Sequence, residues 1–141
     1  MTLLDTSGVF AALRDNDVYH AEAGRALATI PRPLLLSPLV LGELDYMISR
    51  DLGTQAELQF LHDVSAGAYT ITEFSSQDLE DALQILHRFA DLAVGLADAS
   101  IVVLAARYRT RDVFTFDRRH FRARRTLDGQ PFRLLPDDLQ P

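Results

Sequence analysis

The chain has 141 residues, of which 48% are hydrophobic, and its formal net charge is −6. This length and composition suit one packed domain over residues 1–141, and the absence of cysteine excludes disulfides and thiolate metal sites. Because Asp5 interrupts the apolar start and no apolar run reaches about 18 residues, we expect a cytoplasmic protein with no signal peptide and no membrane span.

Short apolar runs alternate with helix-like segments along the first half of the chain. Asp17 is a suitable cap for the second helix, and Ser37 before Pro38 is a typical helix start. The predicted elements are a strand at 3–4, helices at 7–14 and 17–29, a strand at 34–36, and helices at about 38–50 and 54–65.

The second half continues the alternation, with a long helix capped by Ser75 or Ser76. The predicted elements are a strand at 69–72, helices at about 76–89 and 98–108, a strand at 113–116 and an edge strand at 132–135. The helix at 98–108 is apolar all round and should be buried. Strands that alternate with helices imply right-handed crossovers, so we expect an α/β fold, a three-layer α/β/α domain with a mostly parallel central sheet.

The charge is unevenly distributed. Residues 1–104 contain 5 arginines and 15 acids, whereas residues 105–141 contain 9 arginines and 5 acids, and the chain has no lysine. The segment 107–125 holds eight of the arginines. It suits a phosphate-bearing partner, because guanidinium groups bind phosphate through two donors; a solvated basic face is the alternative.

Four carboxylates lie where apolar runs give way to loops or helices. Asp5 follows the first strand, Glu43 lies early in the helix after Pro38, Asp98 opens the helix at 98–108, and Asp117 ends the run 113–116. Open α/β sheets bind ligands at the carboxyl edge of their strands, where these acids should meet. Taken singly, each aspartate also fits a structural role as a helix cap or turn residue.

Helical periodicity does not decide which acid of the helix after Pro38 faces that edge. Glu43 lies on one border of its apolar stripe and Asp45 on the other.

Converging carboxylates need a cation. Two like charges about 4 Å apart repel by roughly 4 kcal/mol at an effective dielectric constant near 20. Oxygen ligands without cysteine or paired histidine suit Mg²⁺ or Mn²⁺ rather than zinc. Such an ion activates water and stabilises charge on a phosphate.

Other chemistries fit less well. The chain has no His-Glu-x-x-His motif, no Gly-x-Ser-x-Gly motif and no phosphate-binding loop that ends in lysine. Phosphotransferring α/β domains also place acids around Mg²⁺ but depend on a lysine, which this chain lacks. His120 follows Asp117 closely and could touch a phosphate, although a structural role is favoured. Asp91 could lie near the entrance to the acidic site, although a solvated loop is favoured.

At these acids the chain resembles the PIN-domain nucleases, and more narrowly the VapC toxins of toxin–antitoxin pairs. The matching stretches occur in order along nearly the whole chain and include all four acids. They are Leu3-Leu4-Asp5-Thr6-Ser7, Leu41-Gly42-Glu43-Leu44, Leu96-Ala97-Asp98-Ala99-Ser100 and Thr115-Phe116-Asp117-Arg118-Arg119-His120-Phe121.

The resemblance implies an endoribonuclease, a metal-dependent hydrolase. It makes Asp5 and Asp98 the expected ligands of Mg²⁺ or Mn²⁺, with Glu43 and Asp117 completing the catalytic pocket. It also implies a homodimer and a partner antitoxin of the VapB type. Two threonines are expected to orient the carboxylates, and three arginines are expected to bind RNA: Thr6, Thr115, Arg118, Arg119 and Arg122.

A catalytically idle PIN-like module that binds or scaffolds is the alternative from a different functional class. Retention of all four acids argues against it.

Overall fold

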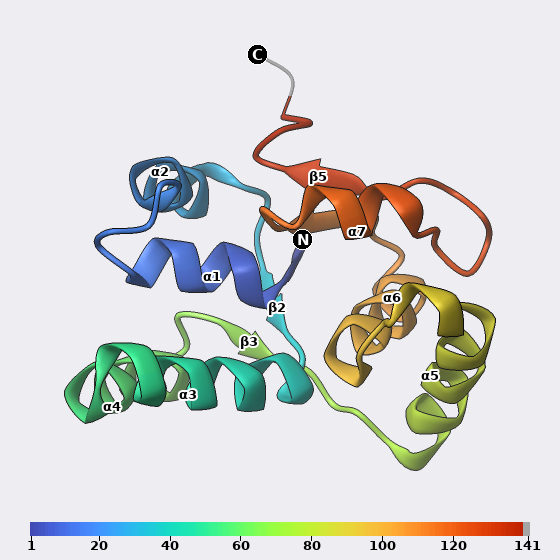
Figure 1. The fold of residues 1–141 in the computed structure, drawn as a ribbon, viewed down its shortest axis with the longest axis horizontal. Helices are drawn as coiled ribbons and strands as arrows, with labels where there is room; N and C mark the ends of the chain where they lie inside the picture. The colour runs from blue at the N-terminus through green and yellow to red at the C-terminus, as the bar shows by residue number, and fades with distance from the viewer. Residues whose placement is uncertain (140–141) are drawn as a thin grey trace.

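The computed structural model describes residues 1–139 and has an α/β fold around a five-stranded sheet (Figure 1). The strand order is β3-β2-β1-β4-β5, and every pairing between these strands is parallel. The strands are β1 (Thr2–Leu4), β2 (Leu34–Leu36), β3 (Thr70–Ile71), β4 (Asp112–Phe114) and β5 (Arg133–Leu135). The expected parallel sheet is therefore confirmed, with the last strand at an edge.

Helices connect these strands. Figure 1 shows α1 to α4 gathered on one side of the view and α5, α6 and α7 on the other. The helices are α1 (Thr6–Leu13), α2 (His20–Thr29), α3 (Pro38–Leu52), α4 (Thr54–Ser65), α5 (Ser76–Arg88), α6 (Leu96–Tyr108) and α7 (Arg118–Ala123), with a 3₁₀ turn at Ala90–Leu92. Within residues 1–139, no helix is both long and apolar enough to cross a bilayer.

The helix starts predicted at two serines are confirmed. Ser37 Oγ accepts a hydrogen bond from the backbone N of Leu39 at 3.2 Å, and Pro38 is the first helical residue. Ser75 forms a reciprocal capping box with Asp78. These local signals are sufficient because each cap satisfies backbone N–H groups that the helix itself leaves unpaired.

Three local predictions need correction. Asp17 does not cap α2; its Oδ1 accepts a hydrogen bond from the backbone N of Tyr19 at 2.8 Å, and the helix begins at His20. The buried helix starts at Leu96, so Asp98 lies inside its first turn. The helix α7 was not predicted, because its sequence Arg-Arg-His-Phe-Arg-Ala lacks an apolar stripe.

The sheet places its reversal of strand order beside the predicted acids. The chain moves from β1 to β2 and β3 in one direction and then returns to place β4 on the other side of β1. The carboxyl ends of β1 and β4 therefore flank the topological switch point, where ligands bind to sheets of this kind. Asp5 directly follows β1, and Asp117 lies three residues after β4 ends.

Two close contacts hold the flanking helices at this edge. A Cβ atom at Gly8 of α1 would lie 2.6 Å from the carbonyl oxygen of Phe114, so only glycine allows α1 to sit this close to β4. Between α3 and α6, the hydroxyls of Ser37 and Ser100 are buried and 2.7 Å apart. The first contact fixes α1 against β4, and the second joins the start of α3 to α6.

Candidate active site

Three aspartates lie at or near the starts of three helices, but none of them caps its helix. Asp5 and Asp117 occupy the N-cap positions of α1 and α7, yet neither side chain accepts a capping hydrogen bond. Asp98 lies in the first turn of α6, whose N-cap residue is Gly95. Helix capping therefore does not explain these acids, although the positive ends of the helix dipoles favour negative charge there.

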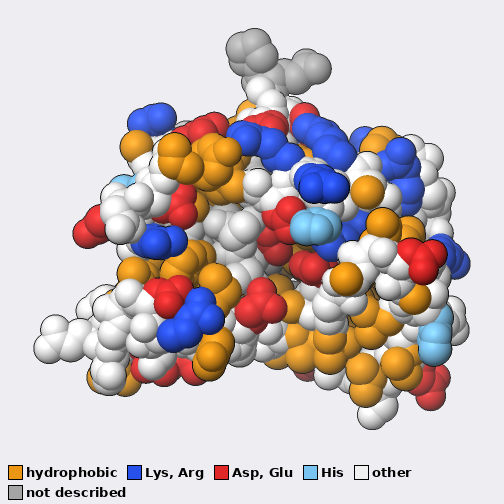
Figure 2. Space-filling model, viewed as in Figure 1, with side chains coloured by type: hydrophobic (Ala, Val, Ile, Leu, Met, Phe, Trp, Pro, Cys, Tyr) orange, Lys and Arg blue, Asp and Glu red, His pale blue; other side chains and the backbone are white. Residues whose placement is uncertain are grey.

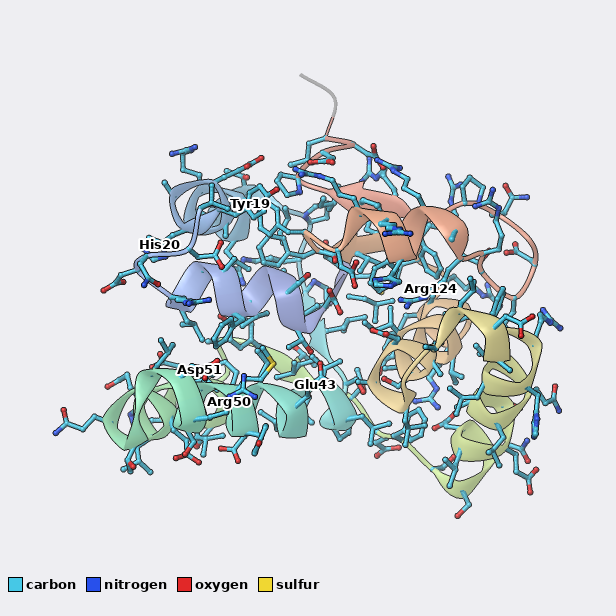
Figure 3. The ribbon with its side chains drawn as sticks, viewed as in Figure 1. Tyr19, His20, Glu43, Arg50, Asp51 and Arg124 are labelled. Atoms are coloured by element: carbon cyan, nitrogen blue, oxygen red, sulfur yellow. The ribbon has the colours of Figure 1, made fainter. Side chains whose placement is uncertain are left out.

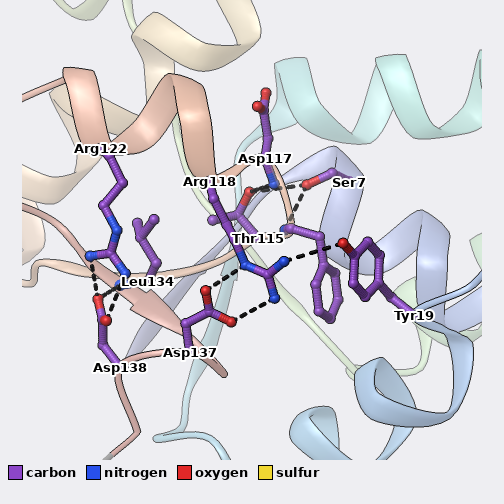
Figure 4. A network of polar contacts seen from close by, with 10 residues as sticks. Ser7, Tyr19, Thr115, Asp117, Arg118, Arg122, Leu134, Asp137 and Asp138 are labelled. Carbon is purple, nitrogen blue, oxygen red and sulfur yellow. Dashed lines mark hydrogen bonds and ion pairs between the residues drawn. The ribbon is translucent and has the colours of Figure 1, made fainter.

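Two hydroxyl groups hold the buried Asp5 carboxylate. Its Oδ2 accepts hydrogen bonds from Ser7 Oγ at 2.6 Å and from Thr115 Oγ1 at 2.7 Å. The same hydroxyl oxygens accept hydrogen bonds from the backbone N–H groups of Phe116 and Asp117, at 3.0 and 2.9 Å. Figure 4 shows the part of this network that joins Ser7, Thr115 and Asp117. The network fixes Asp5 relative to the loop that carries Asp117.

Of the two threonines expected to orient carboxylates, Thr115 contacts Asp5 and Thr6 does not. The hydroxyl of Thr6 is buried and has no hydrogen-bond partner among residues 1–139. Ser7 makes the second bond instead, because one residue further along an α-helix turns the side chain by about 100°. Within residues 1–139, the hydroxyls that hold Asp5 are therefore those of Ser7 and Thr115.

A buried arginine holds Asp98. Arg124 Nη2 donates to Asp98 Oδ2 at 3.1 Å, and the Arg124 side chain is only 3% exposed. The guanidinium carbon lies 4.7 Å from the centroid of the Phe121 ring. Figure 3 shows Arg124 at the end of α7 and Glu43 on α3. A residue that sequence reasoning did not single out thus contacts an expected metal ligand.

Asp117 is paired with His120. His120 Nδ1 lies 2.7 and 2.9 Å from the two carboxylate oxygens of Asp117, one turn earlier on α7. Figure 2 shows acidic side chains and a histidine at the centre of one face, with basic side chains next to them.

The structure separates Glu43 from Asp45. The negative charge of Glu43 is among the causes that raise the pKa of Asp98, after burial, whereas no such effect of Asp45 on Asp98 is found. Asp45 lies toward α4 instead, where contact with its side chain raises the pKa of Glu57.

Burial and mutual repulsion set the electrostatics of the site. Burial raises the pKa of Asp5 to about 6; the hydrogen bonds from Ser7 and Thr115 oppose this shift, and the charges of Asp98 and Asp117 add to it. The pKa of Asp98 is also raised, mainly by burial, and the nearby Arg124 opposes that shift. Both carboxylates are therefore held in surroundings that disfavour their ionised forms.

The carboxylate oxygens of Asp5 and Asp98 are suitable ligands for a hard divalent cation. In each side chain Oδ2 accepts the hydrogen bonds described above, and no residue in 1–139 donates one to Oδ1. In this part of the chain, no group of three or more histidine, aspartate or glutamate side chains is positioned to enclose an ion. Two carboxylates completed by water molecules are nevertheless a usual arrangement for Mg²⁺.

The three arginines expected to bind RNA lie in different surroundings. Arg118 is paired with Asp137 and donates to the Tyr19 hydroxyl at 3.2 Å. Arg122 makes two hydrogen bonds of 2.7 Å to Asp138 (Figure 4). Arg119 is exposed and makes no ion pair within residues 1–139. Of the three, it is the one whose charge no carboxylate in this range neutralises.

Sequence reasoning missed two residues of the site. Ser7 stands in the Asp-Thr-Ser stretch, so its proximity to Asp5 was visible, but its contact with Thr115, directly after β4, was not. Arg124 is one of eight arginines in the segment 107–125, and no periodicity distinguished it from the exposed ones.

Comparison with known proteins agrees with this geometry. The chain matches the family model of the PIN domain over residues 2–126. It is 37% identical over 134 residues to Ribonuclease VapC26 of Mycobacterium tuberculosis (strain ATCC 25618 / H37Rv), a match that covers 95% of this chain and 99% of that protein.

Solved structures show the same fold. The crystal structure of Mycobacterium tuberculosis VapC20, described as a sarcin–ricin loop cleaving toxin, matches with a TM-score of 0.78 and 22% identity, over 83% of this chain and 90% of that one. A toxin–antitoxin complex from Klebsiella pneumoniae matches with a TM-score of 0.67 and 19% identity, over 87% and 92% of the chains. DNA-bound VapBC from Salmonella typhimurium gives 0.64 and 19%, over 95% and 98%.

Proposed function

This chain belongs to the PIN-domain family, alongside VapC ribonucleases, and from that premise we propose that it is a metal-dependent endoribonuclease, the toxin of a type II toxin–antitoxin pair. The observation that carries the proposal is the pair Asp5 and Asp98, each anchored through one oxygen, with the other oxygen free of hydrogen bonds from residues 1–139. The expected place of action is the cytoplasm.

In the proposed reaction Asp5 and Asp98 would hold Mg²⁺ or Mn²⁺, and Glu43 and Asp117 would complete the pocket. The bound ion would activate a water molecule and stabilise charge on the phosphate. Thr115 keeps Asp5 in one orientation, because its hydroxyl is itself fixed by the backbone. The RNA 2′-hydroxyl is not needed as the nucleophile, since water supplies the attacking oxygen.

The basic segment is proposed to bind the RNA backbone. Arg119 is the strongest candidate because it is exposed and unpaired within residues 1–139, whereas Arg118 and Arg122 must first leave their carboxylates. Phosphate contacts of this kind give affinity without sequence preference.

We also propose a VapB-like antitoxin as partner and a homodimer as the assembly. Two of the similar folds were solved as a toxin–antitoxin complex and as DNA-bound VapBC, which supports the antitoxin. The acidic pocket would attract a basic residue from such a partner.

An idle binding module remains the second candidate, favoured by the absence of a three-ligand metal group within residues 1–139. Calorimetry of the purified protein separates the two. Binding of Mg²⁺ that is lost in Asp5→Asn supports the enzyme, whereas no binding in the unmodified protein supports the idle module.

The activity test compares matched acids. We expect Asp5→Asn and Asp98→Asn to lower Mg²⁺-dependent cleavage at least 100-fold, because each removes an ion ligand, while Asp45→Asn on the same helix as Glu43 stays near the unmodified rate. The first RNA probe is a synthetic sarcin–ricin loop, chosen from the description of VapC20. Mapping RNA ends in cells that express the chain or its Asp5→Asn form then identifies the natural target.

Equal cleavage by the Asp5→Asn protein, with its fold verified by circular dichroism, would refute the proposal. Glu43→Gln should lower cleavage more than Asp45→Asn does, since the charge of Glu43, and not that of Asp45, is among those that shift the pKa of Asp98.

A further inference from the structure

Arg124 has an unsatisfied nitrogen in the middle of the site. Its side chain is 3% exposed, Nη2 is bonded to Asp98, and Nη1 is buried without a partner among residues 1–139. Arg118 and Arg122 differ, because each places two nitrogens on one carboxylate. A buried N–H group without a partner costs free energy of folding. Nη1 of Arg124 is therefore expected to bind an acceptor that residues 1–139 do not supply.

The surroundings of Arg124 indicate what that acceptor is. Arg124 lines a recess between the 3₁₀ turn and α7, together with Arg119, His120 and Asp91. The recess adjoins the acids, because Arg124 contacts Asp98 and His120 contacts Asp117. Two arginines and a histidine against one aspartate make it suitable for an anion next to the proposed metal ligands.

We propose that Arg124 is a catalytic residue that holds Asp98 through Nη2 and donates from Nη1 to a non-bridging oxygen of the scissile phosphate. This inference rests on the proposed ribonuclease function. In hydrolysis the oxygen of water bonds to phosphorus and the bond from phosphorus to the leaving ribose oxygen breaks. The proton that water loses is balanced by the one that the leaving oxygen gains.

Negative charge builds on the non-bridging oxygens during this exchange. A fixed guanidinium N–H stabilises that charge more than it stabilises the ground state, because the donor is already oriented and shielded from water. Arginine also stays protonated throughout, so it acts as an electrostatic donor and not as an acid.

The test combines Arg124→Gln and Arg124→Lys with Arg25→Gln as a control for the loss of one positive charge. Arg25 is exposed on α2, outside the basic segment 107–125. We expect Arg124→Gln to slow single-turnover cleavage of the RNA probe 100- to 1,000-fold at saturating Mg²⁺. Lysine can reach Asp98 but offers one nitrogen, so Arg124→Lys should be at least tenfold slower than the unmodified protein.

A second measurement does not depend on cleavage. Calorimetry of metal-free protein should show that Arg124→Gln binds Mg²⁺ as tightly as the unmodified protein or several-fold more tightly, because a positive charge beside Asp98 is removed.

Two results would overturn the proposal. One is cleavage by Arg124→Lys or Arg124→Gln at the rate of Arg25→Gln. The other is weaker Mg²⁺ binding by Arg124→Gln with cleavage restored by excess Mg²⁺, which would make Arg124 only a positioning residue for Asp98. Failure of the ribonuclease proposal is recognised separately, since the unmodified protein would then cleave no better than Asp5→Asn.

Discussion

Asp5 is fixed by hydrogen bonds and yet buried, so its ionised form lacks the stabilisation that a cation could provide. Burial disfavours its charged form, whereas the hydroxyls of Ser7 and Thr115 favour it by donating hydrogen bonds. Burial is the larger effect, so the pKa of Asp5 is raised from 3.8 to about 6. Near neutral pH the carboxylate is ionised at a cost to folding.

This cost predicts that Asp5→Asn stabilises the metal-free protein at pH 8. The folded-state pKa of about 6 lies above the unfolded value of 3.8, so the favourable contribution is complete below pH 3.8 and is lost as the pH rises through 6. A difference of this size corresponds to about 3 kcal/mol. Urea unfolding in EDTA from pH 4 to 8 should show the variant's advantage shrinking toward pH 4.

A stability difference that does not change with pH would contradict this account of Asp5. Added Mg²⁺ at pH 8 should stabilise the unmodified protein and leave Asp5→Asn nearly unchanged, because binding to the native state alone raises stability.

Among the helices and strands, the position of α1 on β4 depends on a glycine, because Gly8 has no side chain at the contact. Gly8 lies against the backbone and ring of Phe114, and Ser7 beside it reaches Thr115 across the same contact. The close packing of α1 on β4 therefore also brings Ser7 to Thr115, and so helps to assemble the acid site.

Gly8→Ala is expected to destabilise the protein by about 1–3 kcal/mol, because the new methyl group would meet the Phe114 carbonyl oxygen at 2.6 Å. Cleavage should fall as well, since α1 carries Ser7. The matched control is Gly24→Ala in α2, where nothing lies within 4 Å of the added carbon. That change should stabilise by about 0.5–1 kcal/mol. Thermal unfolding of both variants measures the contrast, and equal effects would disprove it.

The sequence allowed the strands and most helices to be predicted, for local reasons. The apolar run 34–36 and the helix cap at Ser75 depend only on residues that are close to them in sequence. The site was predicted only as a set of acids. The contact of Ser7 with Thr115 spans 108 positions, and the burial of Arg124 depends on the packing around Phe121, so no local pattern contains either.

At the scale of the whole molecule, the fold concentrates the positive charge near the acids. Residues 105–141 carry a net charge of +4 and the remaining residues −10, and this positive part of the sequence forms β4, α7 and β5. Arginines lie above the central acids in Figure 2. RNA should therefore approach from the α7 side, because the rest of the molecule repels it.

Salt dependence tests this direction of approach. In the Asp5→Asn background, Arg119→Gln should weaken RNA binding and reduce the slope of log K against log salt by about 1. Arg122→Gln should change the slope less, because Asp138 already neutralises Arg122. Fluorescence anisotropy with a labelled RNA measures both slopes. A larger effect of Arg122→Gln would place the RNA elsewhere.

The hydrogen bond from Thr115 to Asp5 joins residues 110 positions apart, and this separation has a consequence for synthesis of the protein. A nascent chain has all of α1 and α3 long before β4 leaves the ribosome. Until then Asp5 lacks one of the two hydroxyls that hold it, and Arg124 does not yet exist beside Asp98. Contacts this distant also form late in folding. The hydrogen bonds that hold Asp5 and Asp98 therefore become complete only after β4 and α7 have been synthesised.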